Sequence, residues 1–186
     1  MRKVLLVFAL LGLITSAATA QDEPSRRSGF WLNVGAGYGS ADFNCDGCDT
    51  DRGSGVSAQI ALGGTLSDQL LLGVESNGWA GSDVWGGFDD AMLGTFAAVI
   101  YFYPSATGNL FIKGGPGFAS WRIEDSGRSE DDTGFGFLVG VGYDLPIGKN
   151  SITPVFAYQH GFMGDKSGLQ GVTQNVFSIG ATFTLH

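Results

Sequence analysis

The sequence predicts an all-β protein: a closed, antiparallel, up-and-down transmembrane β-barrel of eight strands, preceded by a cleavable signal peptide. Three observations predict it. The chain opens with a short export-type segment, apolar and polar residues alternate along eight later segments, and no stretch after residue 20 has the roughly 18 continuous apolar residues of a membrane helix. Lipid offers backbone N–H and C=O groups no partner, so only helices and closed barrels cross a membrane.

The first 20 residues have the pattern of a secretory signal. Arg2 and Lys3 give a positive start, an apolar run extends from residue 4 to about residue 14, and Ala18-Thr19-Ala20 forms an A-x-A cleavage site. The run is shorter than the roughly 20 residues of a spanning helix, which argues against an uncleaved anchor. We therefore expect a signal peptide at 1–20, a short periplasmic N-terminal segment at 21–28 and a barrel domain at 29–186.

Composition restricts the class of function. Cleavage would leave 166 residues, enough for one domain or one small barrel, with a net charge of −10. Such an acidic chain has no nucleic-acid footprint. Glycine is abundant, at 31 residues, but it follows no collagen period and lies within alternating apolar segments, where it disfavours helices.

The first four strands are predicted at 30–39, 56–63, 70–77 and 92–103. The first three place apolar side chains on one face and mostly small or polar ones on the other. The fourth is apolar on both faces, and we assign Phe96, Ala98, Ile100 and Phe102 to the outside. The outward residues of the other three are Phe30, Leu32, Val34, Ala36 and Tyr38, then Val56, Ala58, Ile60 and Leu62, then Leu70, Leu72 and Val74.

The last four strands are predicted at 110–121, 134–144, 152–162 and 177–185. The segment at 134–144 has the cleanest alternation in the chain, with glycine or another inward residue between successive apolar side chains. The outward residues are Leu110, Ile112 and Phe118; Phe135, Phe137, Val139, Val141 and Tyr143; Ile152, Phe156 and Tyr158; and Phe177, Ile179, Ala181, Phe183 and Leu185.

The opposite face of these strands carries polar residues that we expect to line the lumen. Lys113 belongs there because a lysine facing lipid at mid-membrane would cost roughly 2 to 4 kcal/mol. A lumenal Glu75–Lys113 ion pair and separate solvation by trapped water both fit the sequence. The inward face is also rich in glycine, which leaves room for some water-filled space. The predicted lumen residues are Asn33, Gln59, Glu75, Asn77, Lys113, Asp144, Gln159 and Thr182.

The connections between the predicted strands alternate in length. Those at 65–69, 104–109 and 146–150 are short, whereas those at 41–54, 81–90, 124–133 and 164–173 are longer and hydrophilic. This alternation is typical of outer-membrane barrels, with short turns and both termini in the periplasm and long loops outside the cell. The long loops hold most of the acidic residues, and weak divalent-ion bridging to neighbouring lipopolysaccharide is one hypothesis for them.

The C-terminal segment carries a family resemblance. Ser178-x-Gly180-x-x-Phe183-x-Leu185 resembles the C-terminal β-signal of outer-membrane proteins, with His186 as one extra residue after the usual apolar or aromatic end. Over its mature length the chain is similar to the small eight-stranded outer-membrane barrels of the OmpA and OmpX type. The resemblance implies the bacterial outer membrane, contact with its lipid and lipopolysaccharide, and recognition by the barrel-assembly machinery.

Cys45 and Cys48 are the only cysteines, and their C-x-x-C spacing could indicate redox chemistry, zinc or a disulfide. Two thiols supply half of a zinc site, and a redox motif belongs in a βα context. In an oxidising compartment a disulfide that pins the first external loop is favoured. The nearby Asp49-x-Asp51-x-Gly53 faintly resembles a calcium loop, but the remaining ligands of such a loop are absent. We predict no metal site and no cofactor.

No catalytic constellation is present in the sequence, and we predict that the protein is not an enzyme. His160 has no neighbouring serine pattern and fits a strand-end position near lipid headgroups. Aromatic residues such as Trp31, Tyr103 and Tyr158 are assigned to an interfacial girdle or to barrel packing rather than to a sugar site.

Three functions fit these observations. The first is a structural or surface-interaction barrel that anchors acidic loops, and the second is a narrow channel lined by the predicted lumen residues. The third is a soluble periplasmic ligand-binding barrel of lipocalin or avidin type. The loop partner and the oligomeric state do not follow from the sequence.

Overall fold

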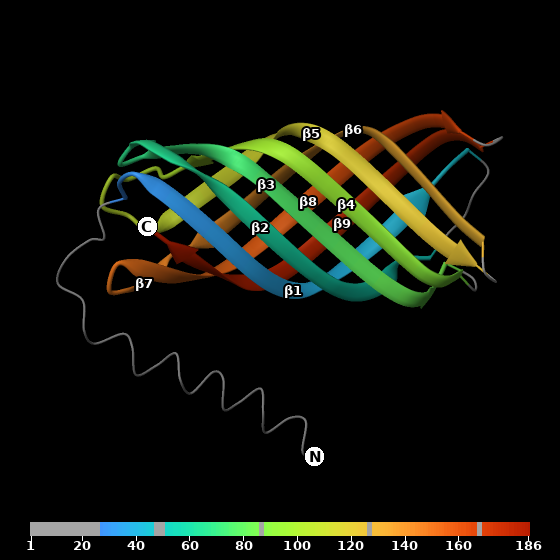
Figure 1. Ribbon diagram of the computed structural model, residues 1–186, viewed down its shortest axis with the longest axis horizontal. Coiled ribbons are helices and arrows are strands. Elements are labelled where there is room, and N and C mark those ends of the chain that lie inside the picture. Colours follow the sequence, from blue (N-terminus) through green and yellow to red (C-terminus); the bar gives the residue numbers. More distant parts are fainter. Residues whose placement is uncertain (1–26, 47–50, 86–87, 126–127, 167–168) are drawn as a thin grey trace, which may run out of the picture.

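The computed structural model describes residues 27–46, 51–85, 88–125, 128–166 and 169–186. The predicted signal peptide and most of the predicted segment at 21–28 lie outside these residues. The described chain forms strands throughout (Figure 1), with no helix long and apolar enough to span a membrane. The strands are β1 (Phe30–Asn44), β2 (Gly53–Ser67), β3 (Leu70–Val84), β4 (Phe88–Phe102), β5 (Leu110–Asp125), β6 (Arg128–Tyr143), β7 (Leu145–Ile147), β8 (Asn150–Lys166) and β9 (Leu169–Leu185).

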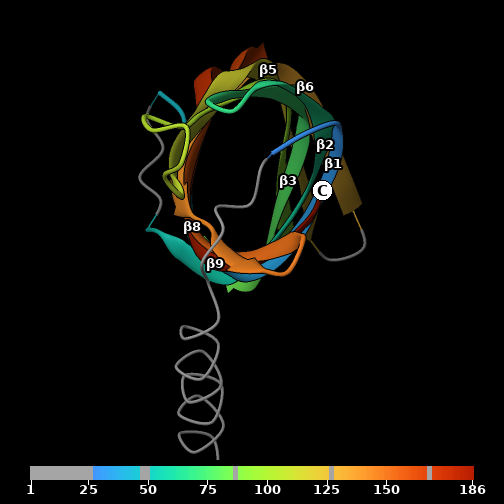
Figure 2. The same cartoon turned by 90° about the vertical axis from the view of Figure 1, so that its left-hand side faces the viewer.

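The eight long strands close into one antiparallel barrel, as predicted. Strands β1 to β6 pair in chain order, β9 pairs with β1 and β8, and β6 pairs with β8 across the seam. Figure 2 shows the closed ring from one end. Residue pairs followed from Tyr38 through β2, β3, β4 and β5 lead to Asp131 on β6. Residue pairs followed from Tyr38 the other way, through β9 and β8, lead to Val141 on β6, so the ring closes with a stagger of ten residues. This stagger means that the strands are strongly tilted against the barrel axis.

The short strand β7 corrects the predicted turn at 146–150. Leu145 pairs with Ile152 and Ile147 pairs with Asn150, so the ladder continues almost to the tip of the hairpin. Only Gly148 and Lys149 remain as the turn. Gly148 has a φ of +63°, a left-handed conformation that glycine adopts without a steric penalty, as two-residue hairpin turns require.

The two faces of the sheet are chemically unlike. Large apolar side chains face outward, including Phe30 at 65% exposed and Phe118 at 70%, whereas the alternate positions are buried inside, as for Trp31 at 1%. The fourth strand follows its assigned faces, with Phe96, Ile100 and Phe102 outside. A lipocalin-type barrel keeps its apolar side inward, so the soluble alternative does not fit this wall.

The predicted long loops are wrong in extent, because the strands continue into them. Strand β5 ends at Asp125 and β6 begins at Arg128, and β8 and β9 are separated by residues 167–168 alone. Large apolar residues are buried at inward positions of the first and last predicted loops, as for Phe43 at 41–54 and Val172 at 164–173. Their burial and the unbroken ladder sustain strands in segments whose polar outward residues masked the alternation.

The barrel has two distinct ends. The turn end holds the short connections after β2, β4, β6 and β7 together with the C-terminus, and the hairpin end holds the other four connections (Figure 1). Backbone hydrogen bonds tie the turn end together. The amide of Thr65 donates to the carbonyl of Gly29, and the amide of Asp144 donates to the carbonyl of Asn109, both at 2.9 Å.

Candidate functional site

The centre of the lumen holds a buried ion pair between β3 and β5. The Nζ of Lys113 lies 2.5 Å from Oε1 of Glu75, and neither side chain is exposed. The Tyr101 hydroxyl donates to Oε2 of Glu75 at 2.5 Å, and Nδ2 of Asn77 donates to Oε1 at 2.9 Å. A desolvated pair is tolerated when further hydrogen bonds satisfy its atoms, and these contacts supply them. Strand β4 separates β3 from β5, so the two side chains meet by pointing into the same narrow lumen.

A chain of amides and hydroxyls extends from this pair to β1 and β9. The Lys113 ammonium lies 3.5 Å from Oε1 of Gln59, whose Nε2 donates to Oδ1 of Asn33 at 2.8 Å. Asn33 then donates to the hydroxyls of Thr182 and Thr184, each at 2.8 Å. The structure thus brings six of the eight predicted lumen residues into one network. Gln159 is buried on β8 outside it, and Asp144 belongs to a second group at the turn end.

The second group closes the turn end around Arg27, a residue to which the sequence assigned no role. The guanidinium of Arg27 is buried, lies 3.7 Å from Oδ2 of Asp144 and stacks 3.4 Å above the ring of Tyr103. It also donates to the carbonyls of Asp68 and Gly108, at 3.3 and 2.6 Å. Arg27 therefore links two short turns and the N-terminal segment to the inside of the barrel.

Asp144 is the acceptor at the centre of this group. It accepts hydrogen bonds from the hydroxyls of Tyr103, at 2.9 Å, and Thr153, at 2.6 Å. Burial, reinforced by the charge of Asp144, raises the pKa of Tyr103 well above its ordinary value. The phenol consequently stays protonated and remains a donor at neutral pH.

The hairpin end is closed by aromatic packing instead of charge. The rings of Trp79 and Trp85 stack at 5.6 Å, and Phe43 packs against Trp85 at 6.1 Å and edge-on against Trp121 at 5.4 Å. Buried aliphatic residues such as Val172 complete this cluster. Trp85 has a φ of 52°, a strained conformation for a bulky residue, and is held by its stacking and by an Nε1 hydrogen bond to the carbonyl of Ala41 at 3.4 Å.

The inward glycines lie against aromatic side chains at some positions and against neighbouring backbone at others, which corrects the expectation of water-filled space around them. A Cβ on Gly63 or Gly73 would lie 2.8 Å from Trp31, and one on Gly81 would lie 2.6 Å from Trp79. The described residues leave a lumenal cavity of about 10 Å³ beside Gln59, Asn77 and Thr182. That volume is near the minimum for one water molecule.

The remaining predicted sites are placed as follows. Cys45 is buried near the hairpin end, and its predicted disulfide partner Cys48 lies outside the described residues. Asp49, in the faint calcium pattern, also lies outside them. Among the described residues, no three His, Cys, Asp or Glu side chains gather as a metal site. The predicted assembly signal, Ser178, Gly180, Phe183 and Leu185, lies on β9 with Phe183 and Leu185 facing outward; its recognition stays a prediction.

Solved structures share this fold at low sequence identity, while a search of curated proteins found no match. Neisserial surface protein A has a TM-score of 0.59 and 17% identity, over 85% of this chain and 97% of that one. OprG of Pseudomonas aeruginosa has a TM-score of 0.54 and 14% identity, over 89% of this chain and 100% of that one. Ail is the attachment invasion locus protein of Yersinia pestis and was solved with the heparin analogue sucrose octasulfate. It has a TM-score of 0.51 and 16% identity, over 84% of this chain and 99% of that one.

The sequence itself matches a described family along almost its whole length. Residues 6–184 match the family described as outer membrane protein beta-barrel domain. The closed eight-stranded ring and its apolar outer wall agree with that description. The chain therefore belongs to the outer-membrane β-barrel domain family and is a protein of the bacterial outer membrane.

Proposed function

We propose that the protein is a closed surface barrel, which anchors acidic hairpins at the outside of the cell and conducts no solute. In this orientation the turn end and both termini face the periplasm, and the hairpin end faces outward. The role is structural or one of surface interaction. The filled lumen carries the proposal, since an eight-stranded barrel is just wide enough for side chains to fill it.

Three successive levels of the lumen support closure. Arg27 and Tyr103 occupy the turn end, the Glu75–Lys113 pair occupies the centre, and the tryptophan cluster occupies the hairpin end. A narrow channel is the alternative that the central polar network favours. Planar-bilayer recording separates the two, because the closed barrel gives no current steps whereas a channel gives discrete ones.

The chemistry of the hairpin end supports a cationic partner. Its exposed acidic residues among those described are Asp46, Asp51, Asp90, Glu124, Glu130, Asp131 and Asp165. Ail was solved with sucrose octasulfate, which is a polyanion. The acidic hairpin end of this barrel would repel such a ligand and attract cationic surfaces or divalent ions.

Surface labelling tests the orientation. Glu124→Cys at the hairpin end and Lys149→Cys at the turn end serve as a matched pair in intact cells treated with a membrane-impermeant maleimide. We expect labelling of Glu124→Cys alone, and labelling of Lys149→Cys alone would reverse the orientation.

Cation binding tests the role of the acidic hairpins. Neutralising Glu130 and Asp131 to Gln and Asn should weaken binding of a polylysine peptide to the purified barrel. Asp68→Asn at the turn end is the control. Equal binding of polylysine by the wild type, the double variant and Asp68→Asn would remove the support for a cationic partner.

A further inference from the structure

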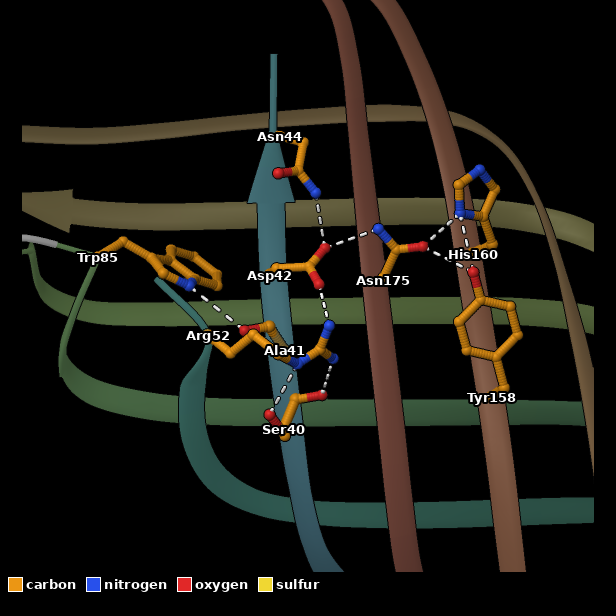
Figure 3. A network of polar contacts seen from close by, with 9 residues as sticks. All are labelled: Ser40, Ala41, Asp42, Asn44, Arg52, Trp85, Tyr158, His160 and Asn175. Carbon is orange, nitrogen blue, oxygen red and sulfur yellow. Dashed lines mark hydrogen bonds and ion pairs between the residues drawn. The ribbon is translucent and has the colours of Figure 1, made fainter. Parts of the chain in front are cut away.

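A cluster of polar side chains lies on the outer wall of the barrel, near the hairpin end. The outer polar cluster consists of Asp42 on β1, Arg52 before β2, Tyr158 and His160 on β8, and Asn175 on β9 (Figure 3). The cluster residues on strands are separated by two or four positions from exposed apolar residues of the same strands, such as Tyr38, Phe156 and Phe177. Residues two or four apart on a strand share a face, so these polar side chains face outward.

Asp42 and Asn175 form the centre of the cluster. The Asp42 carboxylate is paired with Arg52 and accepts a hydrogen bond from Nδ2 of Asn175 at 2.6 Å. The carboxamide oxygen of Asn175 lies 2.6 Å from the Tyr158 hydroxyl and 2.7 Å from Nδ1 of His160. Because Asp42 fixes the amide so that its oxygen faces the histidine, Nδ1 of His160 is the donor, which leaves Nε2 for a partner outside this pair.

The cluster keeps unused hydrogen-bonding capacity toward its surroundings. Arg52 has five N–H donors, of which three bond to Asp42 and to the side chain and carbonyl of Ser40. In the described part of the chain the other two donors and Nε2 of His160 have no protein partner, and 41% of the Arg52 side chain is exposed. These groups would be costly against hydrocarbon, so a polar ligand is expected to meet them.

Aromatic rings flank these free groups. The Arg52 guanidinium lies 5.0 Å above the ring of Phe177, and His160 meets Phe162 edge to face at 4.2 Å. Phe162 is 47% exposed and presents an apolar surface beside the His160 ring. Flat apolar rings beside directional donors and acceptors fit a sugar, whose C–H face stacks while its hydroxyls bond. Tyr158, which the sequence assigned to an interfacial girdle or to barrel packing rather than to a sugar site, is part of this arrangement.

We propose that the outer polar cluster binds the saccharide headgroup of a lipopolysaccharide molecule in the outer leaflet. The family places the wall in the outer membrane, and the orientation under the proposed function places the cluster at the level of that leaflet's headgroups. Apolar residues on the turn-end side of the cluster, such as Ile179, would contact the acyl chains. The ligand thus spans the boundary at which the wall changes from apolar to polar.

Native mass spectrometry of the purified mature barrel tests the site directly. The probes are deep-rough lipopolysaccharide and phosphatidylglycerol, and the variants are Arg52→Gln and His160→Phe. Arg122→Gln is the control, since Arg122 is exposed and faces outward near the hairpin end of β5. Losing a hydrogen bond from a charged group should weaken lipopolysaccharide retention about tenfold in Arg52→Gln, with a smaller loss in His160→Phe.

The outcomes are distinguishable. Retention that falls for lipopolysaccharide in both cluster variants, but not for phosphatidylglycerol or in Arg122→Gln, supports a saccharide site. An equal loss in Arg52→Gln and Arg122→Gln would mean nonspecific charge attraction and overturn the proposal, as would an equal loss of both lipids. His160→Phe keeps the test open if Arg52→Gln fails to fold. Because binding is measured in detergent, it does not depend on orientation in cells, so failure here differs from failure of the proposed function.

Discussion

The two ends of the lumen are closed by different chemistry. At the hairpin end, Trp79, Trp85 and Phe43 fill the barrel by shape, resting on inward glycines. At the turn end, Arg27 and Asp144 close it by charge and directed hydrogen bonds. An aromatic closure is sensitive to added volume and indifferent to protonation, whereas a charged closure is sensitive to the loss of one partner. The Glu75–Lys113 ion pair occupies the centre of the lumen and is held by charge, like the turn end.

Breaking the central pair should have the largest effect on stability. Lys113→Ala leaves the Glu75 carboxylate buried without its cation, and we expect a loss of about 3 to 5 kcal/mol in the free energy of unfolding. The urea midpoint of the refolded barrel measures this loss. The double variant Glu75→Gln/Lys113→Met, which removes both charges, should lose less. An unchanged midpoint in Lys113→Ala would contradict the role of the pair.

Removing the guanidinium at the turn end should have the next largest effect. Arg27→Ala deletes hydrogen bonds from a charged donor and should lower the free energy of unfolding by about 2 to 3 kcal/mol. Arg27→Lys keeps the charge but loses the planar fork, so its urea midpoint should fall between those of the wild type and the alanine variant. Identical midpoints for all three proteins would show that Arg27 does not hold the turn end.

Adding one methyl group should disturb the hairpin end. A Cβ at Gly81 would lie 2.6 Å from Trp79 and 3.1 Å from Val84, so Gly81→Ala should cost about 1 to 2 kcal/mol. Gly78→Ala is the control, because its Cβ would meet nothing within 4 Å. A second substitution, Trp79→Phe, should recover part of the loss in the urea midpoint. Equal midpoints for Gly81→Ala and Gly78→Ala would argue against tight packing there.

The smallest effect is expected from alkaline pH at the turn end. The pKa of Tyr103 is raised in the folded barrel, mainly by burial and then by Asp144. Its contribution is therefore present below the ordinary tyrosine pKa of about 10 and is lost above it, by up to about 1.4 kcal/mol per pH unit. The unfolding midpoint of the wild type should fall between pH 10 and pH 11, a range that ends roughly one unit above that pKa. The fall should be smaller in Tyr103→Phe. The same slope in both proteins would count against this assignment.

Period-two alternation was sufficient to predict the strands and the barrel, because the two faces differ so strongly in chemistry. It failed at residues 124–133 and 164–173, which are mostly polar. The β5–β6 ladder sustains the strands in the first of these segments, and the β8–β9 ladder with the buried Val172 sustains them in the second. Glu75 and Lys113 could be assigned to one face, but their contact depends on lumen width. Arg27 has no periodic context, although a buried Asp144 implies a cation. The glycine–tryptophan contacts depend on the register between strands, which local patterns do not specify.

Tryptophan quenching tests the closed lumen most directly, because all four tryptophans are inside it. Trp31, Trp79, Trp85 and Trp121 are between 1% and 9% exposed. In bilayers, iodide should quench their fluorescence little, and brominated phospholipid should quench it far less than in a Tyr38→Trp variant, whose added ring faces lipid. Strong quenching by iodide would reveal a water-filled lumen, and lipid quenching equal to that of Tyr38→Trp would place the rings on the outer wall; either result would contradict the account.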